Sequence, residues 1–138
     1  MTEKQQLREW INANMSTDTI DELDKWKEKA ASLVGLGPTG NVLIKADPAK
    51  LDAMDHVLLQ LLGRAYAEVG GKAESASMSN SELKASIPVP PGTIDRVLLE
   101  LRRDHIVDSQ NRGENRLIPS RIGDVILRLS RGLGERSQ

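Results

Sequence analysis

The glycine-rich segment Gly35-Leu36-Gly37-Pro38-Thr39-Gly40 matches the G-x-G-x-x-G pattern of dinucleotide-binding proteins. In those proteins a strand precedes the glycines and a helix follows them, so that the pyrophosphate meets backbone N–H groups at a helix N-terminus. Here a helical pattern precedes the glycines, Pro38 lies among them, and the strand-like Val42-Leu43-Ile44 follows. We therefore predict a turn at 35–40, with no nucleotide site and no cofactor.

Cysteine and histidine, which often act in catalysis and metal binding, are absent or rare. The 138 residues include no Cys and two His, His56 and His105, which lie 49 positions apart. Without Cys there are no disulfides, thiolate zinc sites or iron–sulfur clusters. The two His lack metal-ligand spacing, and no acidic pair stands out from the charged helix faces. The sequence therefore favours a binding protein over an enzyme, with no catalytic residue and no metal site.

The chain also lacks the features of a membrane or secreted protein. No uninterrupted apolar run approaches the roughly 18 residues of a membrane span. The first six residues lack the basic-then-apolar order of a signal peptide. We expect a cytoplasmic protein without a membrane partner.

The formal net charge of −1 conceals two unlike halves. Residues 1–74 carry 9 basic and 12 acidic side chains, and seven of the nine basic ones are Lys. Residues 75–138 carry 10 basic and 8 acidic side chains, and nine of the ten basic ones are Arg. The planar guanidinium of Arg suits phosphate oxygens and base edges. This clustering favours nucleic-acid contact, although each Arg taken singly also fits a solvated helix face.

Two amphipathic helices are predicted in the first part of the chain. Residues 4–15 place Leu7, Trp10 and Ile11 on one side, and residues 19–34 repeat apolar side chains at steps of three and four. Thr19 and Glu22 have the spacing of a capping box at the start of the second helix. The two apolar stripes must pack on the rest of the chain or on a partner. Trp10 and Trp26 are therefore candidate protein-interaction residues.

The remainder of the chain shows helical and then strand-like periodicity. Asp47-Pro48 predicts the start of a long helix over 48–69, with His56 off its apolar stripe and thus on the surface or facing a partner. Ser79 and Glu82 form a second capping box, which begins a short helix that stops before Pro88. Further predicted elements are a turn at 89–92, a helix to 103, strands at 106–107 and 116–118, and a helix from 122.

This order of elements resembles the winged helix-turn-helix domain of the MarR/ArsR-like regulators. The apolar and acidic positions of that motif are occupied without a gap by Glu82, Leu83, Ile87, Val89, Ile94, Leu98 and Leu101. The family's step from helix into wing corresponds to Asp104-His105-Ile106-Val107, and Leu117 to Gly123 resembles its step from strand to closing helix. The resemblance implies a mainly α fold with a small β-hairpin wing.

The resemblance also divides the chain. We expect an N-terminal helical extension with a connecting turn and strand at 1–47, a winged helix-turn-helix domain at 48–131, and a flexible tail at 132–138. Two departures from the family are visible. Pro88 replaces the glycine of the turn, and His105 stands where the helix usually ends in a left-handed glycine.

In this family the second helix of the motif lies in the major groove, so the resemblance implies a set of DNA contacts. On the helix they are Thr93 and Arg96 at its start and Arg102 and Arg103 at its end, and on the wing they are Arg112 and Arg116. For Arg102 and Arg103, a favourable interaction with the helix dipole is an equally good explanation.

The leading interpretation is a small DNA-binding regulator that binds double-stranded DNA as a homodimer. The N-terminal helices and the helix over 48–69 would form its interface. The alternative is a winged helix that binds a protein partner in a larger assembly, because Asp95 and an exposed Leu99 occupy the would-be reading face.

Overall fold

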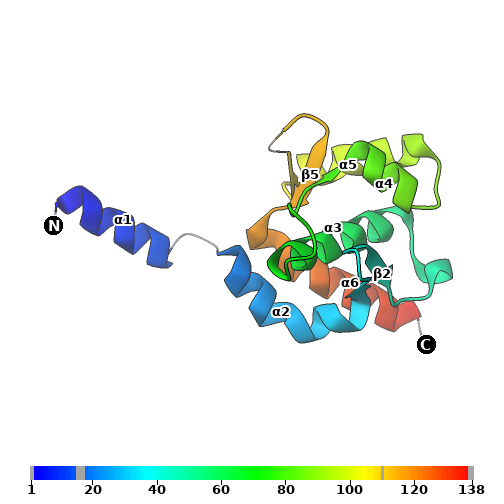
Figure 1. The fold of residues 1–138 in the computed structure, drawn as a ribbon, viewed down its shortest axis with the longest axis horizontal. Coiled ribbons are helices and arrows are strands. Elements are labelled where there is room, and N and C mark those ends of the chain that lie inside the picture. Colours follow the sequence, from blue (N-terminus) through cyan, green and yellow to red (C-terminus); the bar gives the residue numbers. More distant parts are fainter. Residues whose placement is uncertain (1, 15–17, 110, 137–138) are drawn as a thin grey trace.

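Helix α3 (Ala53–Val69) runs through the centre of the fold, and the other large elements pack around it (Figure 1). The computed structural model describes residues 2–14, 18–109 and 111–136. Apolar side chains occupy nearly every face of α3, and such a helix is stable only when neighbours cover it. Its buried apolar residues are Val57, Leu58, Leu59, Leu61, Leu62, Ala65 and Ala67.

The burial of α3 corrects two expectations. We expected one apolar stripe with His56 on the surface, but His56 is buried, as are the neighbouring Asp55 and Gln60. The central turns of α3 are covered by their own chain. They are therefore not available for the dimer interface that we expected from 48–69.

The glycine-rich segment is the turn of a short antiparallel hairpin. Strand β1 (Val34–Leu36) pairs with β2 (Val42–Ile44). The N–H of Gly37 donates to the carbonyl of Asn41 at 2.8 Å, so the predicted turn is confirmed. Strand β2 lies so close to α3 that a Cβ added to Gly63 would be 2.5 Å from a methyl carbon of Val42.

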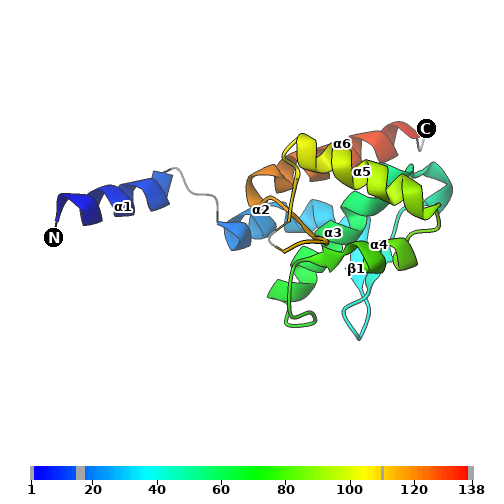
Figure 2. The same cartoon turned by 90° about the horizontal axis from the view of Figure 1, so that it is seen from above.

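Helix α2 (Thr19–Leu33) packs along α6 (Ile122–Arg136) and also touches α3. Leu23, Ala30 and Leu33 of α2 belong to the same core cluster as α3, α5 and α6. Helix α2 and the first hairpin thus pack into the same core as the later elements, across the boundary that we predicted at residue 47. Only α1 (Glu3–Asn14) lies apart from the other elements, as both views of the ribbon show (Figures 1 and 2).

Two helix starts differ from the capping patterns that we predicted. The N-cap of α2 is Asp18, whose carboxylate accepts from the Ile20 N–H at 2.8 Å. Residues 48–50 form a 3-10 turn, η1 (Pro48–Lys50), and α3 begins only at Ala53. Asp52 and Asp55 form a reciprocal capping box there. Such a box satisfies two backbone donors, whereas the Asp47 carboxylate accepts the Ala49 N–H within the 3-10 turn.

The C-terminal half contains the second small sheet. Strand β3 (Met78–Ser79) leads into α4 (Asn80–Ser86) and α5 (Pro91–Arg103), and β4 (Val107–Asp108) and β5 (Glu114–Leu117) follow. The sheet order is β3-β5-β4, with both pairs antiparallel. The predicted hairpin and the capping box of Ser79 and Glu82 are confirmed. We did not predict β3 because two residues carry no periodicity.

The end of the chain differs from our prediction of a flexible tail at 132–138. After the short η2 (Pro119–Arg121), helix α6 continues to Arg136. No proline interrupts the sequence between 122 and 136, so nothing in it forces the helix to stop at 131. Residues 137 and 138 lie outside the described residues.

The fold is mainly helical with small antiparallel sheets, and none of the described helices is long and apolar enough to cross a membrane.

Candidate nucleic-acid interface

Helix α5 has one buried and one exposed face. Its buried residues are Ile94, Val97, Leu98 and Leu101. Asp95, Arg96, Leu99 and Arg103 are exposed on the opposite side. Leu99 is 66% exposed, which confirms its predicted position outside the core. The exposed face therefore mixes two guanidinium groups with one carboxylate and one isobutyl group.

The turn between α4 and α5 sets the start of this face. Helix α4 ends at Ser86 with Ile87 as its C-cap, and Pro90 caps α5 without a side-chain hydrogen bond. The N–H of Thr93 donates to the Pro90 carbonyl at 3.0 Å, and Thr93 itself is half-buried. The prolines fix φ near −65° at three positions of the connection, so the first turn of α5 has little conformational freedom.

Asp95 is held by an ion pair within the motif. The Lys84 ammonium on α4 lies 2.9 Å from the Asp95 carboxylate. This contact places a positive charge next to the acidic residue on the face where DNA was predicted. The pair therefore weakens the repulsion that Asp95 alone would exert on phosphates.

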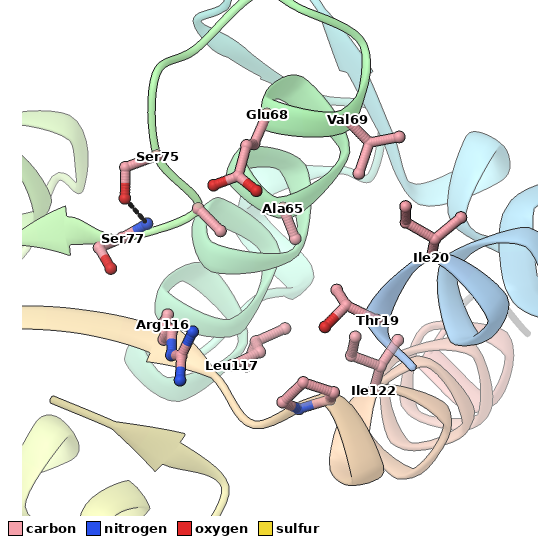
Figure 3. A pocket seen from close by; sticks show the side chains of 12 residues that line it. Thr19, Ile20, Ala65, Glu68, Val69, Ser75, Ser77, Arg116, Leu117 and Ile122 are labelled. Carbon is pink, nitrogen blue, oxygen red and sulfur yellow. Dashed lines mark hydrogen bonds between the residues drawn. The ribbon is translucent and has the colours of Figure 1, made fainter. Parts of the chain in front are cut away.

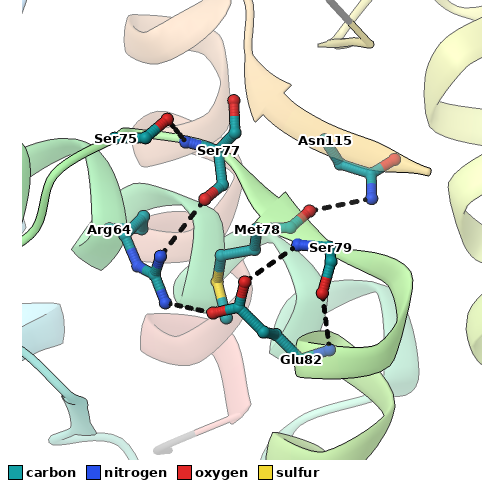
Figure 4. Close-up of polar contacts among 7 residues, drawn as sticks. All are labelled: Arg64, Ser75, Ser77, Met78, Ser79, Glu82 and Asn115. Atoms are coloured by element: carbon teal, nitrogen blue, oxygen red, sulfur yellow. Dashed lines mark hydrogen bonds and ion pairs between the residues drawn. The ribbon is translucent and has the colours of Figure 1, made fainter. Parts of the chain in front are cut away.

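Arg102 does not lie on the exposed face. It is half-buried, and its guanidinium donates to the side-chain oxygen of Asn115 on β5. Asn115 is fully buried, and its amide donates to the Met78 carbonyl at 3.1 Å and to the Asn80 side chain at 2.8 Å (Figure 4 draws the contact to Met78). Arg102 therefore holds the hairpin against α5 and the start of α4, which differs from its predicted DNA contact.

Arg103 is the last residue of α5, and His105 lies just beyond the end of this helix. The Arg103 side chain is exposed, and its guanidinium lies 3.7 Å from the carboxylate of the adjacent Asp104. His105 has φ 58°, so the predicted left-handed helix end is confirmed. Its N–H donates to the Arg102 carbonyl at 3.1 Å and the chain turns into β4. Arg103 therefore remains available for a phosphate.

The two arginines of the β4–β5 hairpin also have different surroundings. Arg116 on β5 is half-buried and lies 3.3 Å from Asp108, its cross-strand neighbour on β4. Arg112 lies at the exposed tip of the hairpin and has no ion-pair partner among the described residues. Of the six residues that we predicted to contact DNA, Arg96, Arg103 and Arg112 present exposed cations, whereas Arg102 and Arg116 stabilise the hairpin.

A further ion pair that we did not predict joins α3 to the start of α4. The Arg64 guanidinium lies 2.6 Å from the Glu82 carboxylate and donates to the Ser77 carbonyl at 3.2 Å (Figure 4). Partial burial alone would raise the pKa of Glu82. Hydrogen bonds from Arg64 and Ser79, with the charge of Arg64, outweigh burial and lower that pKa. The start of α4 is thereby held to the central helix α3.

The candidate protein-interaction residues are not alike. Trp10 on α1 is exposed, whereas Trp26 on α2 is half-buried and packs against Gly123 of α6. The ammonium groups of Lys25 and Lys29 lie 5.5 and 5.6 Å from the centre of the Trp26 ring. Trp26 therefore takes part in the packing between α2 and α6, in addition to its predicted role as a partner contact.

The described residues contain no group of three or more His, Asp or Glu that could hold a metal ion. Comparisons of the chain with models of protein families, with curated proteins and with solved structures found no match.

Proposed function

We propose that the chain is a winged helix-turn-helix protein that binds double-stranded DNA through α5 and the β4–β5 hairpin. The order of α3, β3, α4, α5 and the hairpin supports this fold, as does a sheet in which β5 lies between β3 and β4. In proteins of this class the second helix of the motif enters the major groove and the hairpin contacts the flanking backbone or minor groove. Helix α5 corresponds to that second helix, and the β4–β5 hairpin corresponds to the hairpin of the class.

The observation that carries the proposal is the placement of three exposed cations on these two elements. Arg96 and Arg103 lie on the exposed face of α5, and Arg112 lies at the tip of the hairpin. Their guanidinium groups are not used in packing, unlike those of Arg102 and Arg116. Exposed Arg on a helix and an adjacent hairpin is suited to phosphate contact.

The same face limits the specificity of the proposed interaction. Near the start of α5 the side chains able to read a base edge are Arg96 and Thr93, and Thr93 is half-buried. Leu99 offers only apolar contact. We therefore propose that phosphate contacts supply most of the affinity and that base-sequence preference is weak.

The test is binding of a fluorescent DNA duplex, followed by anisotropy at about 50 and about 200 mM salt. With three phosphate contacts the affinity should fall roughly 40-fold between the two concentrations. Arg96→Ala and Arg112→Ala should each weaken binding and reduce the salt slope by about one. Arg8→Ala on the separate helix α1 removes the same charge and should change neither quantity. Absence of binding at the lower salt concentration would overturn the proposal.

A second candidate function, a protein-binding winged helix, is favoured by the exposure of Leu99. Leu99→Arg separates the two functions because it adds a cation to the proposed DNA face and removes an apolar contact. DNA binding should be unchanged or stronger in this variant. Weaker DNA binding at unchanged stability would instead favour apolar recognition at this face.

We also propose that the chain binds DNA as a homodimer, since two copies would place two α5 helices on one duplex. The buried centre of α3 does not offer the interface, so a surface outside the core must supply it.

A further inference from the structure

Leu99 occupies the middle of the exposed face of α5. It lies two positions from both Val97 and Leu101, which places it about 200° around the helix from each of these buried residues. Its side chain is 66% exposed. Leu99 therefore points away from the core, at the centre of the face that we propose to bind DNA.

Two exposed arginines flank Leu99 along the helix. Arg96 precedes it by three positions and Arg103 follows it by four, so both are its neighbours on the same helix face. Arg96 has no ion-pair partner among the described residues. An Arg side chain is longer than a Leu side chain, so the guanidinium groups extend beyond the isobutyl group. A duplex whose phosphates contact Arg96 and Arg103 would therefore have Leu99 between these contacts, against its base edges.

The first turn of α5 leaves room for such an approach. Gly92 lies seven positions before Leu99, on the same side of the helix, and is exposed. A Cβ added to Gly92 would meet nothing within 4 Å. Because Gly92 has no side chain, the backbone of this turn can come close to a ligand. The first outward side chain on this line of the helix is thus Leu99.

The acidic neighbours of Leu99 do not oppose this contact strongly. Asp95 lies one turn before Leu99, and the Lys84 ammonium lies 2.9 Å from its carboxylate. Glu100 is half-buried and projects about 100° away from Leu99 around the helix. The exposed charges that remain on either side of Leu99 along the helix are those of Arg96 and Arg103.

The isobutyl group of Leu99 can neither donate nor accept a hydrogen bond. In the major groove the apolar group that a base pair presents is the C5-methyl group of thymine. We propose that Leu99 contacts thymine methyl groups, so that the protein prefers duplexes that carry thymine along the groove. This inference rests on the proposed function and identifies its weak base preference as one for thymine.

A matched control is available elsewhere on the surface. Ile20 at the start of α2 and Val69 at the end of α3 line a pocket of about 310 Å³ (Figure 3), and neither helix belongs to the proposed DNA face. Ile20 is 60% exposed, close to the value of Leu99. Ile20→Ala removes as many carbon atoms as Leu99→Ala, so the two variants differ in position and not in the size of the change.

The test measures anisotropy of a fluorescent duplex made only of A·T pairs and of the same duplex with uracil in place of every thymine. Uracil lacks the methyl group and keeps the hydrogen-bonding groups of thymine. At about 50 mM salt the uracil duplex should bind about 4-fold more weakly, the change expected for one buried methyl group. The ratio should persist at about 200 mM salt, because an apolar contact releases no counterions. Leu99→Ala should bind both duplexes equally, whereas Ile20→Ala should keep the ratio.

A second measurement adds the methyl group to a different base. A duplex made only of G·C pairs should bind more tightly when 5-methylcytosine replaces cytosine, and Leu99→Ala should lose this gain. Absence of the gain in the unmodified protein would overturn the inference.

The outcomes separate this inference from the proposed function. Binding of the thymine and uracil duplexes with equal affinity would overturn the thymine contact and leave DNA binding in place. A ratio that persists in Leu99→Ala would also overturn it, because uracil would then act through the shape of the duplex. If none of the duplexes binds at about 50 mM salt, both proposals fail and the exposed Leu99 favours a protein partner.

Discussion

Arg102 on α5 donates a hydrogen bond to the buried side-chain oxygen of Asn115 on β5, and the Asn115 amide donates in turn to β3 and to the start of α4. One asparagine thus connects the hairpin with both α4 and α5. Neighbouring Arg103 is exposed. Of the two adjacent arginines, Arg102 therefore stabilises the packing of the hairpin, whereas Arg103 faces solvent.

Asn115→Ala should destabilise the fold by about 2–3 kcal/mol, because it leaves the Met78 carbonyl and the Arg102 guanidinium without their buried partner. Urea unfolding followed by circular dichroism measures this change. Asn111→Ala in the exposed loop of the same hairpin is the matched control and should stay within about 0.5 kcal/mol. Equal effects of the two substitutions would contradict a structural role for Asn115.

Gly123→Ala should disturb the contact between α2 and α6. A Cβ at this position would lie 2.8 Å from the Trp26 indole nitrogen, so the indole must move. Overpacking of this kind costs about 1–3 kcal/mol. The fluorescence of Trp26, recorded in a Trp10→Phe background, should shift at the same time. Gly92→Ala, whose Cβ would meet nothing within 4 Å, should be neutral or slightly stabilising.

Tyr66 provides a pH-dependent test of the packing between α2 and α3. Burial, together with the charge of Asp24, raises the pKa of Tyr66 from 10.0 to about 12. Its hydroxyl donates to the Leu23 carbonyl at 2.6 Å. Because Tyr66 is the sole tyrosine, ultraviolet absorbance of tyrosinate reports it directly. The midpoint should lie near 12 in the folded protein and near 10 in urea.

The raised pKa of Tyr66 also fixes the direction of its effect on stability. The neutral phenol is favoured by the folded state, so its contribution is complete below pH 10 and is lost as the pH rises toward 12. Tyr66→Phe should remove this part of the pH dependence. At neutral pH it should cost about 1 kcal/mol through the lost hydrogen bond. A native midpoint near 10 would show that the hydroxyl is not enclosed.

Glu82 should contribute in the opposite direction. Its pKa is lowered from 4.5, so its contribution to stability is complete above that value and is lost as the pH falls through the lowered pKa. The difference in unfolding free energy between the unmodified protein and Glu82→Gln should shrink in acid. The side chain is 47% exposed, so the difference should stay below about 1 kcal/mol. Asp24→Asn breaks the more exposed pair with Lys27 and should have a smaller effect.

Periodicity and local hydrogen-bonding patterns predicted most of the helices and the β4–β5 hairpin. The capping box of Ser79 and Glu82 and the left-handed His105 were predictable because each depends on a few neighbouring residues. The start of α3 was predicted too early because Asp47-Pro48 and Asp52 both have capping chemistry. Two-residue strands such as β3 depend on a distant partner and leave no periodic pattern.

The burial of His56 shows why the centre of the fold was harder to predict. One stripe of leucines is visible in the sequence of α3, but three helices (α2, α5 and α6) and three strands (β1, β2 and β5) pack against this helix. The surface on which α2 packs could not be predicted for the same reason, since its partner α6 begins about 90 positions later. The sequence showed that α2 needs a partner surface and not which surface that is.

The sequence by itself determined where the helices and the hairpin form and that Arg gathers in the second half of the chain. The tertiary structure alone decided that Arg102 and Arg116 hold the hairpin while Arg96, Arg103 and Arg112 face solvent. The physical reason is that periodicity assigns a residue to a face of its own element. What lies opposite that face depends on Asn115 and Asp108, which only the folded chain brings within hydrogen-bonding distance.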